Sequence, residues 1–109
     1  MTEIKVVPLS VNKVWMGRRF KTPLYKSYEI VVINLLPKIE NLVSPFRIEL
    51  NFGFSSPLAD IDNPIKPFLD ILQKKYKIND KDIFELNIKK EIVKKGSEFI
   101  KFNITNIIL

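Results

Sequence analysis

Residues 46–54 read FRIELNFGF, and this stretch decides the fold of the 109-residue chain. Apolar side chains alternate in it with polar residues or glycine, and the apolar set is Phe46, Ile48, Leu50, Phe52 and Phe54. Because successive side chains of a β-strand point to opposite faces of the sheet, a period of two puts the whole apolar set on one face. The stretch therefore predicts a strand with one face against the core and the other in water.

Amphipathic segments on either side of this strand predict two helices. Before it, apolar residues recur at helical spacing after Thr22, the expected N-cap, and Pro23, the expected first helical residue, and Pro37 is expected to end that helix. After it, the Asn63-Pro64 step opens a segment with an apolar stripe at positions i, i+3, i+4, i+7 and i+11, formed by Ile65, Phe68, Leu69, Leu72 and Tyr76.

The remaining segments complete the expected fold. Residues 4–7 are a short β-branched run that predicts a first strand. Residues 9–22 have no steady periodicity and predict a long basic loop or an irregular hairpin. Residues 82–93 and 99–107 predict two strands that form a hairpin across a Gly-containing turn. The order β-α-β-α-β-β then predicts a single α+β domain over residues 1–109, with a mixed sheet and two helices packed on one face.

Composition removes several classes of enzyme. The chain has no histidine and no cysteine, 18 Lys+Arg against 12 Asp+Glu, and a net charge of +6. Without cysteine there is no thiolate nucleophile, disulfide or thiolate-held metal, and without histidine there is no imidazole base or His-ligated metal. Any enzymatic chemistry must therefore use carboxylates, lysines, hydroxyls or a hard cation held by oxygen atoms.

Charge is distributed unevenly along the chain. Residues 1–26 carry six basic and one acidic side chain, residues 27–72 carry three and six, and residues 73–109 carry nine and five. Two basic ends around an acidic middle suit a protein that grips a polyanion, although a solvated lysine-rich surface explains the same balance without a function. No run approaches the roughly 20 apolar residues of a membrane span, and the first residues lack the apolar stretch of a secretory signal. We therefore expect an intracellular protein with no membrane partner.

The acidic middle contains the segment in which chemistry is most expected. Asp60 and Asp62 are two residues apart, so in an extended segment both carboxylates point to the same side. Asn63 precedes a proline and is expected to cap the helix that follows. Lys66 lies in the first turn of that helix and is spaced to pair with Asp70 at i, i+4. A capping cluster with no further function is the alternative interpretation of the same residues.

A second acidic group, Asp80 and Asp82, follows this helix. If its turn folds back beside the start of the helix, Asp80 joins Asp60 and Asp62 in a carboxylate cluster. Such a cluster, without histidine or cysteine, selects Mg²⁺ or Mn²⁺ over zinc. On a basic protein, a metal site of this kind is typical of phosphate-ester chemistry.

The order and spacing of these residues closely resemble the RusA family of Holliday-junction resolvases. The resemblance rests on three segments, which are Pro8-Leu9-Ser10-Val11-Asn12-Lys13-Val14-Trp15, then Asp60-x-Asp62-Asn63-x-x-Lys66-x-x-x-Asp70-x-Leu72, then Ile78-Asn79-Asp80-Lys81-Asp82-Ile83. Family members often carry a dense basic run before the first motif aspartate, where this chain has residues 55–59, SSPLA. The acidic pair of the family's turn stands here as Asn79-Asp80, with Asp82 as a possible substitute.

The resemblance implies a homodimeric, Mg²⁺-dependent endonuclease, with Mn²⁺ as a substitute, that introduces paired nicks into four-way DNA junctions. It implies that Asp60, Asp62 and Asp80 are the catalytic, metal-binding carboxylates, and that Lys66 contacts the scissile phosphate. It also implies that Asn12 belongs to a DNA-contacting loop. The location implied is cytoplasmic, in association with the nucleoid or in a virus-infected host cell.

A basic region with interleaved aromatic residues accompanies that loop. Such a mixture suits contact with distorted or unstacked nucleic acid, and here it consists of Lys13, Arg18, Arg19 and Lys21 beside Trp15 and Phe20. The alternative is a basic surface loop anchored in the core by its two aromatic side chains. Lys89 and Lys90 are expected either to protect an edge strand or to reach DNA phosphates. The rival function for the whole chain is a non-catalytic nucleic-acid-binding module.

Overall fold

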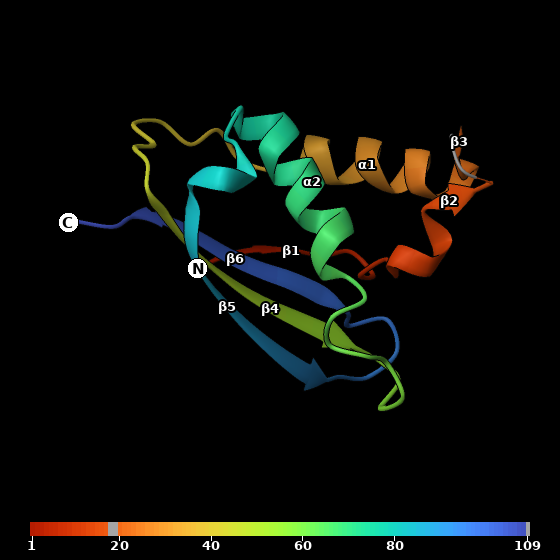
Figure 1. Cartoon of the computed structure of the whole chain (residues 1–109). Coiled ribbons are helices and arrows are strands. Elements are labelled where there is room, and N and C mark those ends of the chain that lie inside the picture. The colour runs from red at the N-terminus through yellow and green to blue at the C-terminus, as the bar shows by residue number, and fades with distance from the viewer. Residues whose placement is uncertain (18–19, 109) are drawn as a thin grey trace.

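The structure is a computed structural model that describes residues 1–17 and 20–108. Its centre is a four-stranded sheet, and both helices cover the same face of it (Figure 1). The elements of this layer pair are β1 (Thr2–Ile4), α1 (Pro23–Leu35), β4 (Phe46–Phe54), α2 (Ile65–Tyr76), β5 (Ile83–Ile92) and β6 (Phe99–Asn106). The predicted α+β class, with a mixed sheet and two helices on one face, is confirmed.

β4 is a central strand of the sheet, whose order is β1-β6-β4-β5. It pairs antiparallel with β6 and parallel with β5, so that Leu50 lies opposite Phe102 on one side and Ile88 on the other. The alternating apolar side chains of β4 are all buried, as the period of two predicts. The opposite face of the sheet is polar and carries ion pairs such as Arg47 with Glu85.

The predicted hairpin between the last two strands is wrong. β5 and β6 follow each other in the sequence, but β4 lies between them in the sheet. The connection after β5 passes the end of β4, where the N–H of Val93 donates to the carbonyl of Phe54 over 2.7 Å. A strand that is paired on both edges buries more apolar surface than an edge strand does. The apolar alternation of β4 is stronger than that of β5, which explains why β4 takes the central position.

Both helices match their predicted positions. The hydroxyl of Thr22 accepts the N–H of Tyr25 over 3.1 Å, Pro23 opens α1, and the helix ends two residues before Pro37. Of the predicted apolar stripe of α2, Phe68 and Leu72 are buried and the other three residues are partly buried, while Ile71, outside the predicted stripe, is also buried. The ring of Phe68 packs edge-on to Phe52 and Phe102 with centroids 6.2 and 5.8 Å away.

The N-terminal third is more irregular than the rest. β1 is shorter than predicted and lies earlier, at Thr2–Ile4 instead of residues 4–7. The basic segment forms a 3₁₀ turn, η1 (Val11–Lys13), and a small hairpin of β2 (Trp15–Met16) with β3 (Phe20–Lys21). The irregular hairpin, one of the two predicted alternatives for this segment, is therefore the one observed.

Candidate functional site

The segment that carries Asp60 and Asp62 lies beyond the end of β4, before α2 begins (Figure 1). It consists of consecutive turns: the N–H of Asn63 donates to the carbonyl of Asp60 over 3.3 Å, and that of Ile65 to the carbonyl of Asp62 over 3.2 Å. The predicted extended geometry is therefore wrong, so alternation of side chains along a strand does not place the two carboxylates on one side. Both aspartates are exposed.

Asn63 has a different role from the predicted helix cap. Pro64 occupies the N-cap position of α2, so the side chain of Asn63 is not the cap. Instead, its main-chain carbonyl accepts the N–H of Val11 over 2.8 Å. This bond joins η1 to the start of α2, two segments that lie 52 residues apart in the sequence.

η1 presents the two polar residues of the N-terminal motif. The hydroxyl of Ser10 accepts the N–H of Asn12 over 3.2 Å and thereby caps this short turn. Asn12 and Lys13 are exposed. The structure therefore places one amide and one ammonium group of the predicted DNA-contacting loop beside the Asp60–Lys66 segment.

Lys66 is paired within its own helix. Its Nζ atom donates to Asp70 Oδ1 over 2.7 Å, which confirms the predicted i, i+4 pair. The hydrogen bond to Asp70, together with the negative charges of Asp70 and Asp80, raises the pKa of Lys66. Both side chains are well exposed, so the pair contributes little to stability. A DNA phosphate that binds Lys66 must compete with Asp70.

Asp80 does not join Asp60 and Asp62. It lies in the 3₁₀ turn η2 (Asp80–Asp82), directly before β5, at the end of the sheet where β4 starts. Because β4 and β5 are parallel, the chain that leaves the end of β4 returns through α2 to the opposite end before β5 begins (Figure 1). The ten residues of β5 span roughly 30 Å at about 3.3 Å each, although Asp80 lies near enough to the start of α2 for its charge to help raise the pKa of Lys66.

The predicted three-carboxylate metal site is therefore not assembled. Ligands of one Mg²⁺ lie about 2.1 Å from the ion, and no three acidic side chains in the part of the chain that the structure describes are grouped to hold a metal. Asp82 lies in the same 3₁₀ turn as Asp80. The three predicted ligands, as arranged here, do not fit a single ion.

Lys90 has a positioning role that differs from the two roles expected for it, protection of an edge strand and contact with DNA phosphates. Its Nζ atom donates to the carbonyl oxygens of Ala59 and, over 3.4 Å, of Pro57, which fixes the chain immediately before Asp60. Lys90 lies opposite Phe52, on the helix-covered face of the sheet. A lysine in phase with the inward residues Leu86 and Ile88 is the signal that identifies it.

Of the remaining predicted DNA-contacting residues, the structure describes Lys21 alone. Lys21 lies over the ring of Tyr25, 4.7 Å from its centroid, and 3.7 Å from a carboxylate oxygen of Glu29, so its charge already has partners. Arg18 and Arg19 lie outside the described residues.

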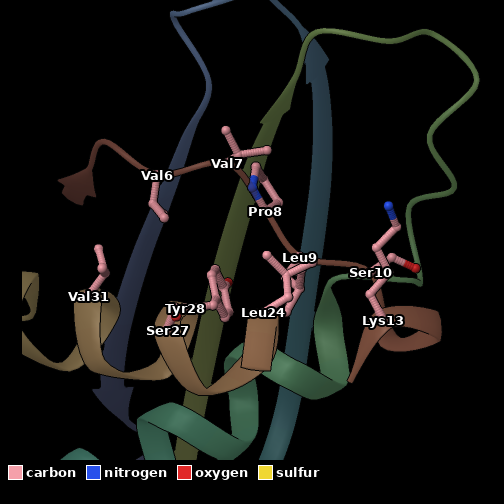
Figure 2. Close-up of a pocket in the computed structure, with 10 residues that line it drawn as sticks. All are labelled: Val6, Val7, Pro8, Leu9, Ser10, Lys13, Leu24, Ser27, Tyr28 and Val31. Atoms are coloured by element: carbon pink, nitrogen blue, oxygen red, sulfur yellow. The ribbon is translucent and has the colours of Figure 1, made fainter. Parts of the chain in front are cut away.

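An apolar hollow of about 510 Å³ lies next to η1, between the N-terminal segment and α1 (Figure 2). Its walls include Val7, Leu9, Leu24 and Val31, and Lys13 lies at the end nearest η1. The hollow adjoins the docked loop, but none of the predicted acidic residues lines it.

Neither a comparison with protein-family models nor one with curated proteins finds a match to this chain. Among the described residues, none of the helices has the length and apolar character needed to cross a bilayer.

Proposed function

We propose that this chain is a Mg²⁺-dependent endonuclease of the RusA type that binds four-way DNA junctions and nicks them as a homodimer. The observation that carries the proposal is the bond between the N–H of Val11 and the carbonyl of Asn63. It brings together two of the three segments on which the resemblance rests. A net charge of +6 supports a polyanionic partner.

The docked segments suggest distinct roles in DNA binding. Asn12 offers an amide and Lys13 an ammonium group, both exposed and both suited to phosphate oxygens. Lys66 becomes available for the scissile phosphate when that phosphate replaces Asp70 as its partner. Asp60 and Asp62 are exposed carboxylates in the turns directly before Asn63, whose carbonyl binds η1, and Asp80, which is not grouped with them, has a metal-binding role by resemblance alone.

A non-catalytic nucleic-acid-binding module is the second candidate. The observation that favours it is the position of Asp80 at the other end of β4 and β5. In this case Asp60 and Asp62 only form turns before α2, and the basic residues alone bind DNA. Both candidates bind branched DNA inside a cell and need no membrane.

The test compares cleavage and binding with the same DNA. Wild type and Asp62→Asn are mixed with a labelled four-way junction in Mg²⁺, Mn²⁺ or EDTA, and nicking and binding are measured separately. The nuclease proposal predicts nicking only with metal, lost in Asp62→Asn while binding is retained. Glu40→Gln, an exposed carboxylate in the loop after α1, is the matched control and should cut normally. Binding without cleavage by the wild type would favour the second candidate.

A further inference from the structure

β5 is an unusually open edge of the sheet. It is ten residues long and stands last in the strand order, while the edge at the other side, β1, has only three residues. Long edges expose a row of main-chain donors and acceptors, which proteins usually shorten or cover. β5 also exposes apolar side chains, with Phe84 62% and Leu86 40% accessible. This edge therefore has the features of a surface that another strand covers.

We propose that a second copy of this chain pairs its β5 antiparallel with this β5, with Asn87 opposite the partner's Asn87. In that register Glu85 lies opposite the partner's Lys89, and Leu86 lies opposite the partner's Ile88. Two-fold symmetry repeats each pair. Opposite charges and apolar side chains that face each other directly across antiparallel strands are the stabilising pairs of a sheet.

In this pairing, side chains that lie opposite each other point to the same face of the combined sheet. Glu85, Asn87 and Lys89 lie opposite Arg47, Glu49 and Asn51 of β4, on the polar face of the sheet. Leu86 and Ile88 lie opposite the buried Ile48 and Leu50, on the helix-covered face. The ion pairs of the proposed dimer therefore form in water, and its apolar pairs extend the core.

Other registers of the same strand are worse. With the axis at Ile88, Glu85 faces the partner's Glu91, a pair of like charges that the axis at Asn87 avoids. With the axis at Leu86, no opposite charges face each other. With the axis at Lys90, Lys89 meets Glu91, but Lys90 faces itself and only the last part of the strand is paired. Like charges directly opposite are destabilising, so the sequence of β5 favours the axis at Asn87.

This contact gives a closed dimer and does not continue into a filament. An isologous contact uses the same edge of both copies, so it makes one continuous eight-stranded sheet with only the short β1 strands at its ends. This inference gives an interface to the homodimer of the proposed function and rests on that part of it. It does not require that the chain cut DNA.

Charge exchange tests the register. The mass of the full chain is measured by light scattering across a concentration series, without DNA. We expect the wild type to dimerise, and Glu85→Lys and Lys89→Glu each to raise the dissociation constant at least about tenfold, because each variant sets like charges opposite each other twice. The double variant Glu85→Lys/Lys89→Glu restores opposite charges and should dimerise like the wild type. A mixture of the two single variants should form a heterodimer.

Two controls separate the interface from the fold. Arg47→Gln removes the neighbour of Glu85 within the same chain and should leave the dimer intact. Glu91→Lys reverses a charge on the same strand outside the proposed ion pair and should also dimerise. Thermal unfolding confirms that each variant is folded.

Three outcomes would overturn the inference: a monomeric wild type, folded single variants that dimerise as the wild type does, or a folded double variant that stays monomeric. Loss of the dimer only in Leu24→Ser or Val31→Ser would assign the interface to the hollow beside α1. A dimer that passes these tests but cuts no DNA would leave the inference standing and refute the nuclease.

Discussion

The main-chain N–H of Val11 donates a 2.8 Å hydrogen bond to the carbonyl oxygen of Asn63, and through it the N-terminal loop is held at the start of α2. Val11 begins η1, and the exposed Asn12 and Lys13 follow it directly. This main-chain bond between segments distant in the sequence therefore helps to fix the position of these two polar groups relative to Asp60 and Asp62.

Val11→Pro tests that bond. Proline is compatible with the first position of a 3₁₀ turn but has no N–H, so the substitution removes the donor. We expect the free energy of unfolding to fall by about 1 kcal/mol and the affinity for a four-way junction to fall as the loop loses its position. Urea unfolding and fluorescence anisotropy measure the two effects. Val11→Ala, which keeps the N–H, should bind as the wild type does; equal binding by the proline variant would contradict the role of the bond.

Asp70→Asn tests whether Asp70 competes with a DNA phosphate for binding to Lys66. The carboxylate of Asp70 raises the pKa of Lys66 through a hydrogen bond and its charge, so the amide should let the pKa of the lysine fall. The substitution also removes a competitor for phosphate, and we expect junction binding to tighten severalfold. NMR titration of the lysine side chain and anisotropy measure these changes. Weaker binding by Asp70→Asn would place Asp70 itself in the DNA contact.

The pair of Lys66 with Asp70 makes the free energy of unfolding slightly dependent on pH. The pKa of Lys66 is raised in the folded protein, so the stability from its pair with Asp70 is fully present below the ordinary lysine pKa of 10.5. That stability is lost as the pH rises through the higher, folded value. Between pH 9 and 12, the wild type should therefore lose its advantage over Lys66→Met in urea unfolding, and a constant difference across this range would contradict the assignment.

The stability that Glu29 contributes to the folded protein depends on pH in the acidic range. Burial alone would raise its pKa, but the hydrogen bond from Lys74 and the charges of Lys74 and Lys21 outweigh burial and lower it. Because the folded pKa lies below the ordinary value of 4.5, this stability is present above that value and is lost as the pH falls through the folded value. Glu29→Gln should be destabilised by about 0.5–1 kcal/mol at pH 7, with the difference shrinking toward pH 3. A difference that grows on acidification would contradict the pairing.

Gly53 on β4 has no room for a side chain. It lies opposite Phe99 of β6, and a Cβ atom at this position would overlap the Phe99 ring. Gly53→Ala should lower the free energy of unfolding by about 1–3 kcal/mol, the usual cost of overpacking. In a Phe99→Ala background the same change should cost much less. An equal cost in both backgrounds would show that the ring is not the cause.

Local periodicity explains the parts of the fold that the sequence could predict. β4 and α2 appear at their expected residues because each repeats its apolar positions with a single period, and Thr22 with Pro23 marks the start of α1 by cap chemistry. The partners of β5 and β6 could not be predicted in this way. Strand pairing depends on which strand buries more apolar surface across the sheet, and no local pattern around Gly96 records that β4 lies between them.

The candidate site was predictable to a similar extent. The pair of Lys66 with Asp70 follows from helical spacing, and the docking of η1 on Asn63 agrees with the motif order. Parallel pairing places the start of β5, and Asp80 before it, at the opposite end of the sheet from the end of β4, and the sequence did not show which strands are neighbours. The contact that Lys90 makes was not predicted, because it depends on where the loop before Asp60 passes.

Nuclease activity is measured with a four-way junction labelled on all four strands. If the chain is a junction-resolving nuclease, the wild type with Mg²⁺ or Mn²⁺ produces nicks in pairs on opposing strands of the junction, EDTA abolishes them, and linear duplex of the same sequence stays intact. A wild-type chain that binds the junction yet leaves all four strands uncut with either metal would contradict this function.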